Sequence, residues 1–287
     1  MNHLKIKKIP MKSIWIILAC ISLPILNYEH NVTFLSSLIN FIIIIIFLRL
    51  AFKKRWRDTA GLRVCCRHAV IAFTVTAVMT GIVYYYISRT VTAHGIAFQN
   101  RFELGNQELY FYTVFQTLNE EIITGALLLF SVRKKWPGIH PVIISIGAAM
   151  LFTVAHGLMY RFAFDERSII ELPALIALFA VGIIRNNTIL GFNHIGFSWA
   201  LHLSWNLVFF GGRYSYVGTA TELDQADLFN GIMGEPAFIA AMIILSIITS
   251  FFLFRNRRRE LLHGRALQAD RDASGLTDRV KSDCAPQ

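Results

Sequence analysis

Two adjacent glutamates lie in the middle of a strongly apolar stretch of the chain. Glu120 and Glu121 belong to residues 116–130, a segment otherwise suited to cross a lipid bilayer. A carboxylate at the centre of a bilayer costs at least ~2.5 kcal/mol on insertion scales, so it requires partners and commonly marks a functional site. The pair therefore indicates a site, and its partners are expected among the polar residues of the other apolar segments.

Two later apolar segments carry such residues at helical spacing. His156 follows Phe152 by four positions, and Asn206 follows His202 by four, so each pair lies on one face of a helix. Because neighbouring helical residues point about 100° apart, the two glutamates are expected to need different partners. At a rise of ~1.5 Å per residue, all these polar groups fall within roughly two helical turns in depth. We expect them to converge in the outer half of the membrane, with Phe152 packing against them.

Such a set of groups can hydrolyse an amide bond. A carboxylate beside a histidine can hold a water molecule and accept its proton, while a second histidine and an asparagine amide can donate hydrogen bonds to the resulting oxyanion. The same groups could bind a divalent metal such as zinc, although the chain has no HExxH sequence; it also lacks a GxSxG serine elbow. Taken singly, an intramembrane histidine or asparagine is equally well explained as a contact between helices.

The composition indicates an all-α, polytopic membrane protein. Hydrophobic residues make up 55% of the 287 positions, and apolar runs alternate with short polar or basic loops. The net charge of +10 is concentrated beside those runs, which is typical of membrane orientation signals and not of nucleic-acid binding. The four cysteines show neither a disulfide framework nor zinc-site spacing. We expect a bundle of about eight transmembrane helices, at residues 14–26, 34–50, 69–88, 109–132, 139–160, 169–184, 188–210 and 236–254.

The distribution of basic residues predicts the orientation of these helices. With eight spans, the cytoplasmic side would hold 23 Lys and Arg residues, Arg185 in a loop among them, and the opposite side five. Both termini are then cytoplasmic, and short loops without a large soluble domain suit the inner (plasma) membrane of a bacterium. The expected parts are N-terminal helices one to three (1–104), a core of helices four to seven (105–212), an outer loop with the last helix (213–254) and a basic tail (255–287).

The ordered motifs resemble the CPBP family, the CAAX-processing and bacteriocin-processing (Abi) intramembrane proteases. Glu120-Glu121 matches the Glu-Glu motif of that family, Phe152 to His156 its Phe-x-x-x-His motif, and His202 to Asn206 its His-x-x-x-Asn motif. The resemblance covers roughly residues 105–212. It implies an all-helical bundle of about eight spans in which Glu120 and His156 activate water, while His202 and Asn206 complete the site and hold the oxyanion. The implied partners are the lipid bilayer and a membrane-associated, prenylated or secreted peptide substrate.

One position departs from the family pattern. The first motif usually continues to an arginine four residues after the second glutamate, where this chain has Gly125. Without that arginine, Glu121 must be protonated, hydrogen-bonded or paired with a group from another helix, and Arg161 is the candidate partner. The departure also leaves room for a catalytically inactive membrane scaffold or bacteriocin-immunity protein on the same fold. An ion-coupled transporter is a further alternative, although the halves of the chain show no internal symmetry.

Overall fold

The computed structural model describes residues 34–62, 66–93, 107–163, 169–213 and 225–258. Within these ranges every regular element is a helix, so the predicted all-α class is confirmed. The elements are α2 (Phe34–Phe52), the 3-10 turn η1 (Lys53–Arg55), α3 (Trp56–Thr59), α4 (Cys66–Ala93), α5 (Gln107–Glu120), the π-helical segment η3 (Glu121–Leu127), α6 (Leu128–Lys135), α7 (Pro141–Ala163), α8 (Leu172–Phe192), α9 (Gly196–Arg213), α10 (Gln225–Met233) and a last helix, Pro236–Arg258.

Four of these helices are long and apolar enough to cross a membrane. They are Val70–Thr90 within α4, Pro141–Leu158 within α7, α8, and the last helix. Many of their large apolar side chains face outward, among them Ile243, Ile247 and Phe251 of the last helix. Outward apolar faces suit lipid contact, so the chain is a membrane protein with transmembrane helices. The count of eight spans stays a prediction, and the expected first span, 14–26, lies outside the described residues.

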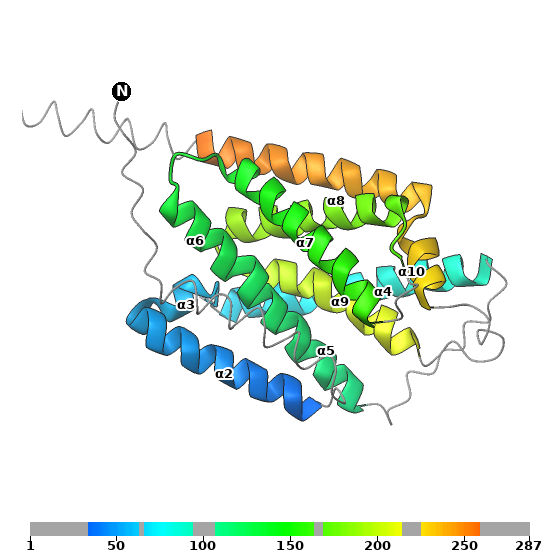
Figure 1. Ribbon diagram of the computed structural model, residues 1–287, viewed down its shortest axis with the longest axis horizontal. Helices are drawn as coiled ribbons and strands as arrows, with labels where there is room; N and C mark the ends of the chain where they lie inside the picture. Colours follow the sequence, from blue (N-terminus) through cyan, green and yellow to red (C-terminus); the bar gives the residue numbers. More distant parts are fainter. Residues whose placement is uncertain (1–33, 63–65, 94–106, 164–168, 214–224, 259–287) are drawn as a thin grey trace, which may run out of the picture.

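The long helices run alternately in opposite directions (Figure 1). The end of α6, the start of α7, the α8–α9 connection and α3 all lie at one end of the bundle, to the left in Figure 1, and α10 lies at the other end. Two hydrogen bonds tie that left-hand end together: Ile195 N donates to Gly61 O at 3.1 Å, and Arg133 Nη1 donates to Leu190 O at 3.4 Å. The orientation of these helices in the membrane stays a prediction.

Small residues allow α7 and α8 to approach closely. A Cβ on Gly182 of α8 would lie 3.1 Å from the Cβ of Ala149 and 3.4 Å from a ring carbon of Phe152. Close backbone contact of this kind favours helix association in a membrane, because lipid tails are as apolar as the side chains and the hydrophobic effect contributes little there. The α7–α8 pair thus brings Phe152 against the middle of α8.

Three consecutive polar residues of α8 connect it to three different helices. Arg185 bonds Glu121 of η3, as described below, and Asn186 Nδ2 donates to Ser145 O of α7 at 3.0 Å. Asn187 Nδ2 donates to Thr249 Oγ1 at 3.1 Å and Ser250 Oγ at 2.9 Å on the last helix. All three side chains are buried. Because successive positions on a helix point about 100° apart, these three side chains reach three neighbours. Helix α8 is therefore hydrogen-bonded to η3, α7 and the last helix.

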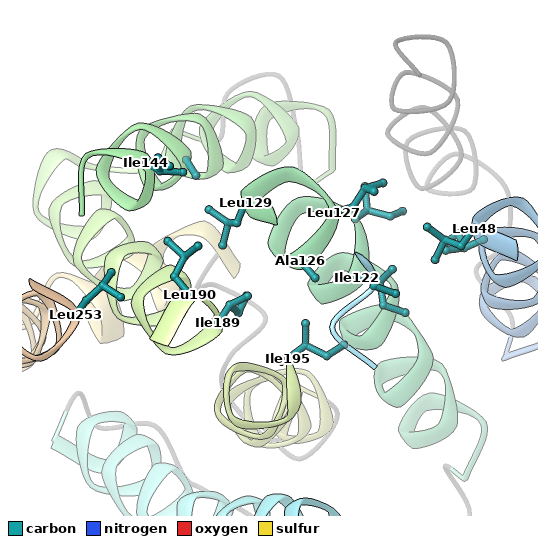
Figure 2. Packing of buried hydrophobic residues seen from close by; sticks show 14 residues of the cluster. Leu48, Ile122, Ala126, Leu127, Leu129, Ile144, Ile189, Leu190, Ile195 and Leu253 are labelled. Atoms are coloured by element: carbon teal, nitrogen blue, oxygen red, sulfur yellow. The ribbon is translucent and has the colours of Figure 1, made fainter. Parts of the chain in front are cut away.

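The largest buried apolar cluster surrounds η3 and α6 (Figure 2). Ile122, Ala126 and Leu127 from these elements are fully buried, and they belong to one cluster with Ile189 of α8 and Ile195 at the start of α9. The polar residues at the beginning of η3 therefore lie directly beside tightly packed apolar side chains of the same segment.

The predicted division between spans six and seven is wrong. Residues 185–187 were expected to form a loop between 169–184 and 188–210, but α8 continues through them to Phe192 and ends at Asn193, whose φ of 56° is left-handed. Arg185 is only 5% exposed, so it does not belong to a cytoplasmic loop. Removing it leaves 22 basic residues against five, which still favours the predicted orientation.

Candidate functional site

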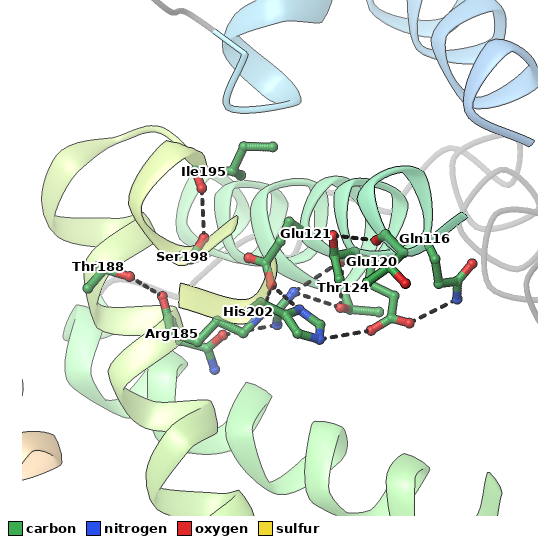
Figure 3. Close-up of polar contacts among 12 residues, drawn as sticks. Gln116, Glu120, Glu121, Thr124, Arg185, Thr188, Ile195, Ser198 and His202 are labelled. Atoms are coloured by element: carbon green, nitrogen blue, oxygen red, sulfur yellow. Dashed lines mark hydrogen bonds and ion pairs between the residues drawn. The ribbon is translucent and has the colours of Figure 1, made fainter. Parts of the chain in front are cut away.

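Glu121 is the buried centre of a charged cluster inside the bundle (Figure 3). Its side chain is 0% exposed, and its Oε1 accepts hydrogen bonds from Arg185 Nε at 2.6 Å and His202 Nδ1 at 2.9 Å. The Arg185 side chain is 6% exposed, so the ion pair is almost dry. A buried carboxylate is stable only when it is paired in this manner. The second oxygen, Oε2, has no hydrogen-bond partner among the described residues.

Arg185 fixes the start of the π-helical segment. Its Nη2 donates to Glu120 O at 3.1 Å and to Thr124 Oγ1 at 2.9 Å, in addition to the Nε bond with Glu121. The guanidinium carbon also lies 5.1 Å from the centre of the Phe152 ring. A planar guanidinium with several fixed donors suits such a site. Because π-helical turns recur at functional sites, the position of η3 directly after Glu120 fits the interpretation of this region as a site.

His202 lies between the two glutamates. Its Nδ1 contacts Glu121, and its Nε2 is 3.7 Å from Glu120 Oε2. Glu120 Oε1 accepts a hydrogen bond from Gln116 Nε2 at 2.9 Å. The direct hydrogen-bond partners of the two glutamates thus differ, as expected, but His202 lies beside both carboxylates. The carboxylates also differ in environment, since the Glu120 side chain is 26% exposed and Glu121 is fully buried.

His156 lies close to this cluster without bonding to it directly. Its Nδ1 is 2.9 Å from Phe152 O, and the two rings are 4.1 Å apart between their centres. It also interacts electrostatically with Glu120, His202 and Arg185. Phe152 packs between His156 and Arg185, as the sequence predicted.

Asn206 is half-buried on α9, one helical turn beyond His202. Among the described residues, no hydrogen bond joins it to either glutamate or either histidine. The structure thus brings Glu120, Glu121 and His202 into one cluster, places His156 beside it, and has Asn206 on the same helix as His202 without a hydrogen bond to these described residues.

Arg185 is the residue that the sequence interpretation missed, and Gly125 explains its position. A Cβ on Gly125 would lie 3.0 Å from Arg185 Nη2, 2.8 Å from Ile189 Cδ1 and 3.5 Å from Glu121 Oε2. The absence of a side chain at this position leaves room for the guanidinium from α8. The cation in contact with Glu121 is Arg185, while the side chain of Arg161, the partner expected from the sequence, lies outside the described part. The sequence held one signal of a buried cation: the run from Arg185 to Asn187 contains no Gly or Pro, and apolar residues continue on both sides of it.

The described residues do not present a metal-binding set. Within them, no group of three or more His, Cys, Asp or Glu side chains is arranged to hold a metal ion. The cation that Glu121 contacts is the Arg185 guanidinium, and the same carboxylate oxygen also accepts from His202.

No family model matches the chain, and no curated protein or solved structure matches it either. The CPBP resemblance therefore depends on its motif residues and on the cluster that those residues form.

Proposed function

We propose that this chain is an intramembrane endopeptidase of the CPBP, glutamate-dependent kind, which hydrolyses a peptide bond in a membrane-associated, prenylated or secreted peptide. The observation that carries the proposal is the series Arg185–Glu121–His202–Glu120, in which each group contacts or faces the next and which is buried at its Arg185–Glu121 end. Burying an ion pair and a histidine in a membrane bundle is costly. The series ends at Glu120, the more exposed of its two carboxylates.

The protons of the site follow from its hydrogen bonds. A carboxylate can only accept, so His202 Nδ1 carries the proton donated to Glu121, and His202 Nε2 is an acceptor in the neutral ring. His156 has the same arrangement, because the Phe152 carbonyl oxygen can only accept from its Nδ1. In its neutral form each imidazole thus presents an acceptor nitrogen, which suits holding a water molecule.

Glu120 is the general base in the proposed reaction. The 3.7 Å between Glu120 Oε2 and His202 Nε2 is too long for a direct hydrogen bond, yet both atoms can accept from one water molecule at about 2.8 Å each. The water oxygen attacks the carbonyl carbon of the peptide while its proton passes to Glu120. Glu120 then gives that proton to the nitrogen of the leaving amine as the C–N bond breaks.

Asn206 is the proposed donor to the oxyanion. With both histidines acting as acceptors, the neutral amide of Asn206 is the member of the motif set that can donate to the developing negative charge. Its place one turn from His202 on α9 puts it on the same face as that histidine. Arg185 and Glu121 do not touch substrate in this scheme; they fix the His202 ring and its tautomer.

The test is a comparison of protein N-termini in cells that carry different versions of the chain. Glu120→Gln and His202→Ala should each abolish the appearance of new N-termini from membrane or secreted proteins, at unchanged levels of the chain. Glu171→Gln is the matched control, because it makes the same chemical change at an exposed residue at the start of α8. Deletion of the chain must first give a measurable phenotype. If cells with Glu120→Gln then have the same N-termini as the wild type and do not show the deletion phenotype, the scaffold alternative is correct.

A further inference from the structure

A cavity of about 360 Å³ opens at the end of the bundle opposite α10, away from the Glu–His cluster. Arg133 and Lys134 of α6 line it, together with Arg257 near the end of the last helix and Asn193 in the α8–α9 connection. No acidic residue is among the described residues that line it. Three cationic side chains from two helices around one cavity favour an anionic ligand.

The wall of this cavity is fixed by hydrogen bonds. Arg133 Nη1 donates to Asn193 Oδ1 at 3.2 Å and to Leu190 O in the last turn of α8 at 3.4 Å. Asn193 has the left-handed conformation that ends α8, which turns the chain toward α9. Arg133 and Asn193 thus have defined positions, whereas Lys134, which also lines the cavity, is exposed.

The surroundings place the cavity at the level of lipid head groups. Trp136 follows α6 directly, is 38% exposed and stacks under Lys135 Nζ at 4.7 Å from its ring centre. An exposed Trp beside basic residues at a helix end is typical of the membrane–water interface. Phe130 and Ile139 add an apolar side to the cavity, which fits the glycerol and upper acyl region of a lipid.

We propose that this cavity binds a phosphate group, presented by the head group of an anionic phospholipid of the adjacent leaflet. Guanidinium groups match phosphate oxygens in geometry as well as charge, and basic pockets between membrane helices are suited to such head groups. The volume of about 360 Å³ is at the lower end of ordinary ligand sites. The site is independent of the proposed protease activity, since it shares no residue with the Glu–His cluster.

The test uses pairs of substitutions with equal charge. Lys134→Gln with Arg257→Gln removes two cations that line the cavity, and Lys135→Gln with Arg258→Gln removes two from adjacent positions that do not. The full chain in neutral detergent is titrated with phosphatidylglycerol, and native mass spectrometry gives the dissociation constant of the first bound lipid. A parallel titration uses inorganic phosphate. Melting temperatures of both variants verify that they fold.

The cavity pair should weaken phosphatidylglycerol binding about 30-fold, from ~1 kcal/mol for each basic residue. The control pair should weaken it less than about threefold, because its charges act only over a distance through solvent. Equal weakening by both pairs would overturn the proposal in favour of diffuse surface charge. Loss of inorganic phosphate binding without loss of lipid binding would overturn the lipid as the source.

A single substitution repeats the comparison if the double variant does not fold. Lys134 is exposed, so Lys134→Gln should leave the fold intact and weaken lipid binding about fivefold. Lys135→Gln is its control. If Lys134→Gln weakens binding no more than Lys135→Gln does, the cavity is not the lipid site.

Discussion

Removing the cation at Glu121 should destabilise the bundle strongly. The substitution Arg185→Met keeps an unbranched apolar stem but removes the guanidinium, which leaves a carboxylate that is 0% exposed without its 2.6 Å partner. Breaking a buried ion pair from one side costs about 3–5 kcal/mol. His202 still donates a hydrogen bond to the same oxygen at 2.9 Å, which offsets part of the lost interaction. We therefore expect the lower part of that range, about 3 kcal/mol.

A double substitution separates the charge from the packing. Arg185→Met together with Glu121→Leu removes both partners, and apolar replacement of a buried pair is often neutral. The double variant should therefore be more stable than Arg185→Met alone. The measurement is the free energy of unfolding in mixed micelles, titrated with sodium dodecyl sulfate and followed by tryptophan fluorescence. If Arg185→Met changes that free energy by less than about 0.5 kcal/mol, as an ordinary surface substitution would, Glu121 does not depend on Arg185.

Placing an arginine at position 125, where the motif of the CPBP family has one, provides a sharper version of the same experiment. A Cβ on Gly125 would lie 3.5 Å from Glu121 Oε2 but 2.8 Å from Ile189 Cδ1 and 3.0 Å from Arg185 Nη2. Gly125→Arg alone should therefore destabilise the protein. Combined with Arg185→Ala and Ile189→Val, which remove the two obstructing groups, it should be accommodated. The triple variant should regain most of the stability that Arg185→Ala loses. Absence of any recovery would refute the idea that one cation can serve Glu121 from either helix.

Two further predictions concern the glycine and the metal. Gly125→Ala should lower the free energy of unfolding by about 1–3 kcal/mol through overpacking, because Arg185 Nη2 is held by its own hydrogen bonds at 3.0 Å from the new Cβ. Gly147→Ala is the control and should not destabilise, because a Cβ there would have nothing within 4 Å. Equal losses for the two variants in the same unfolding titration would contradict this prediction. Processing should continue in the presence of a strong chelator, because Glu121 Oε1 already accepts from Arg185 Nε and His202 Nδ1; N-termini that vanish on chelation and return with zinc would show a metal-dependent reaction instead.

The main elements of the site could be predicted from the sequence because the cost of intramembrane charge is large. Glu120, Glu121 and His202 stood out as polar residues at similar depths in apolar segments, and the structure brings these three together. Spacing along a helix could not show how they would pair. One imidazole has two nitrogens on opposite edges, so a single His202 can reach two glutamates that point in different directions.

Arg185 could not be found by composition alone. A run of three polar residues between apolar segments is the ordinary signature of a loop, and residues 185–187 have that appearance. The same run is buried here because each side chain meets a different helix, and such pairing depends on how the neighbours are arranged around α8. The π-helical winding of η3 could not be predicted from the sequence of that segment either. It accompanies the contacts of Arg185, a residue of another helix, with Glu120 O and Thr124.

Moving the cation from the helix of the glutamates to α8 changes what the ion pair does. An arginine at position 125 would neutralise Glu121 within its own helix and would leave α8 unattached to it. With Arg185 in that role, the position of Glu121, and through it the ring of His202, depends on how α8 packs against η3. Asn186 and Asn187 connect α8 to α7 and the last helix in turn. The geometry of the proposed catalytic groups is therefore set by the packing of the whole bundle, and substitutions on α8 far from Glu120 should alter processing before they unfold the chain.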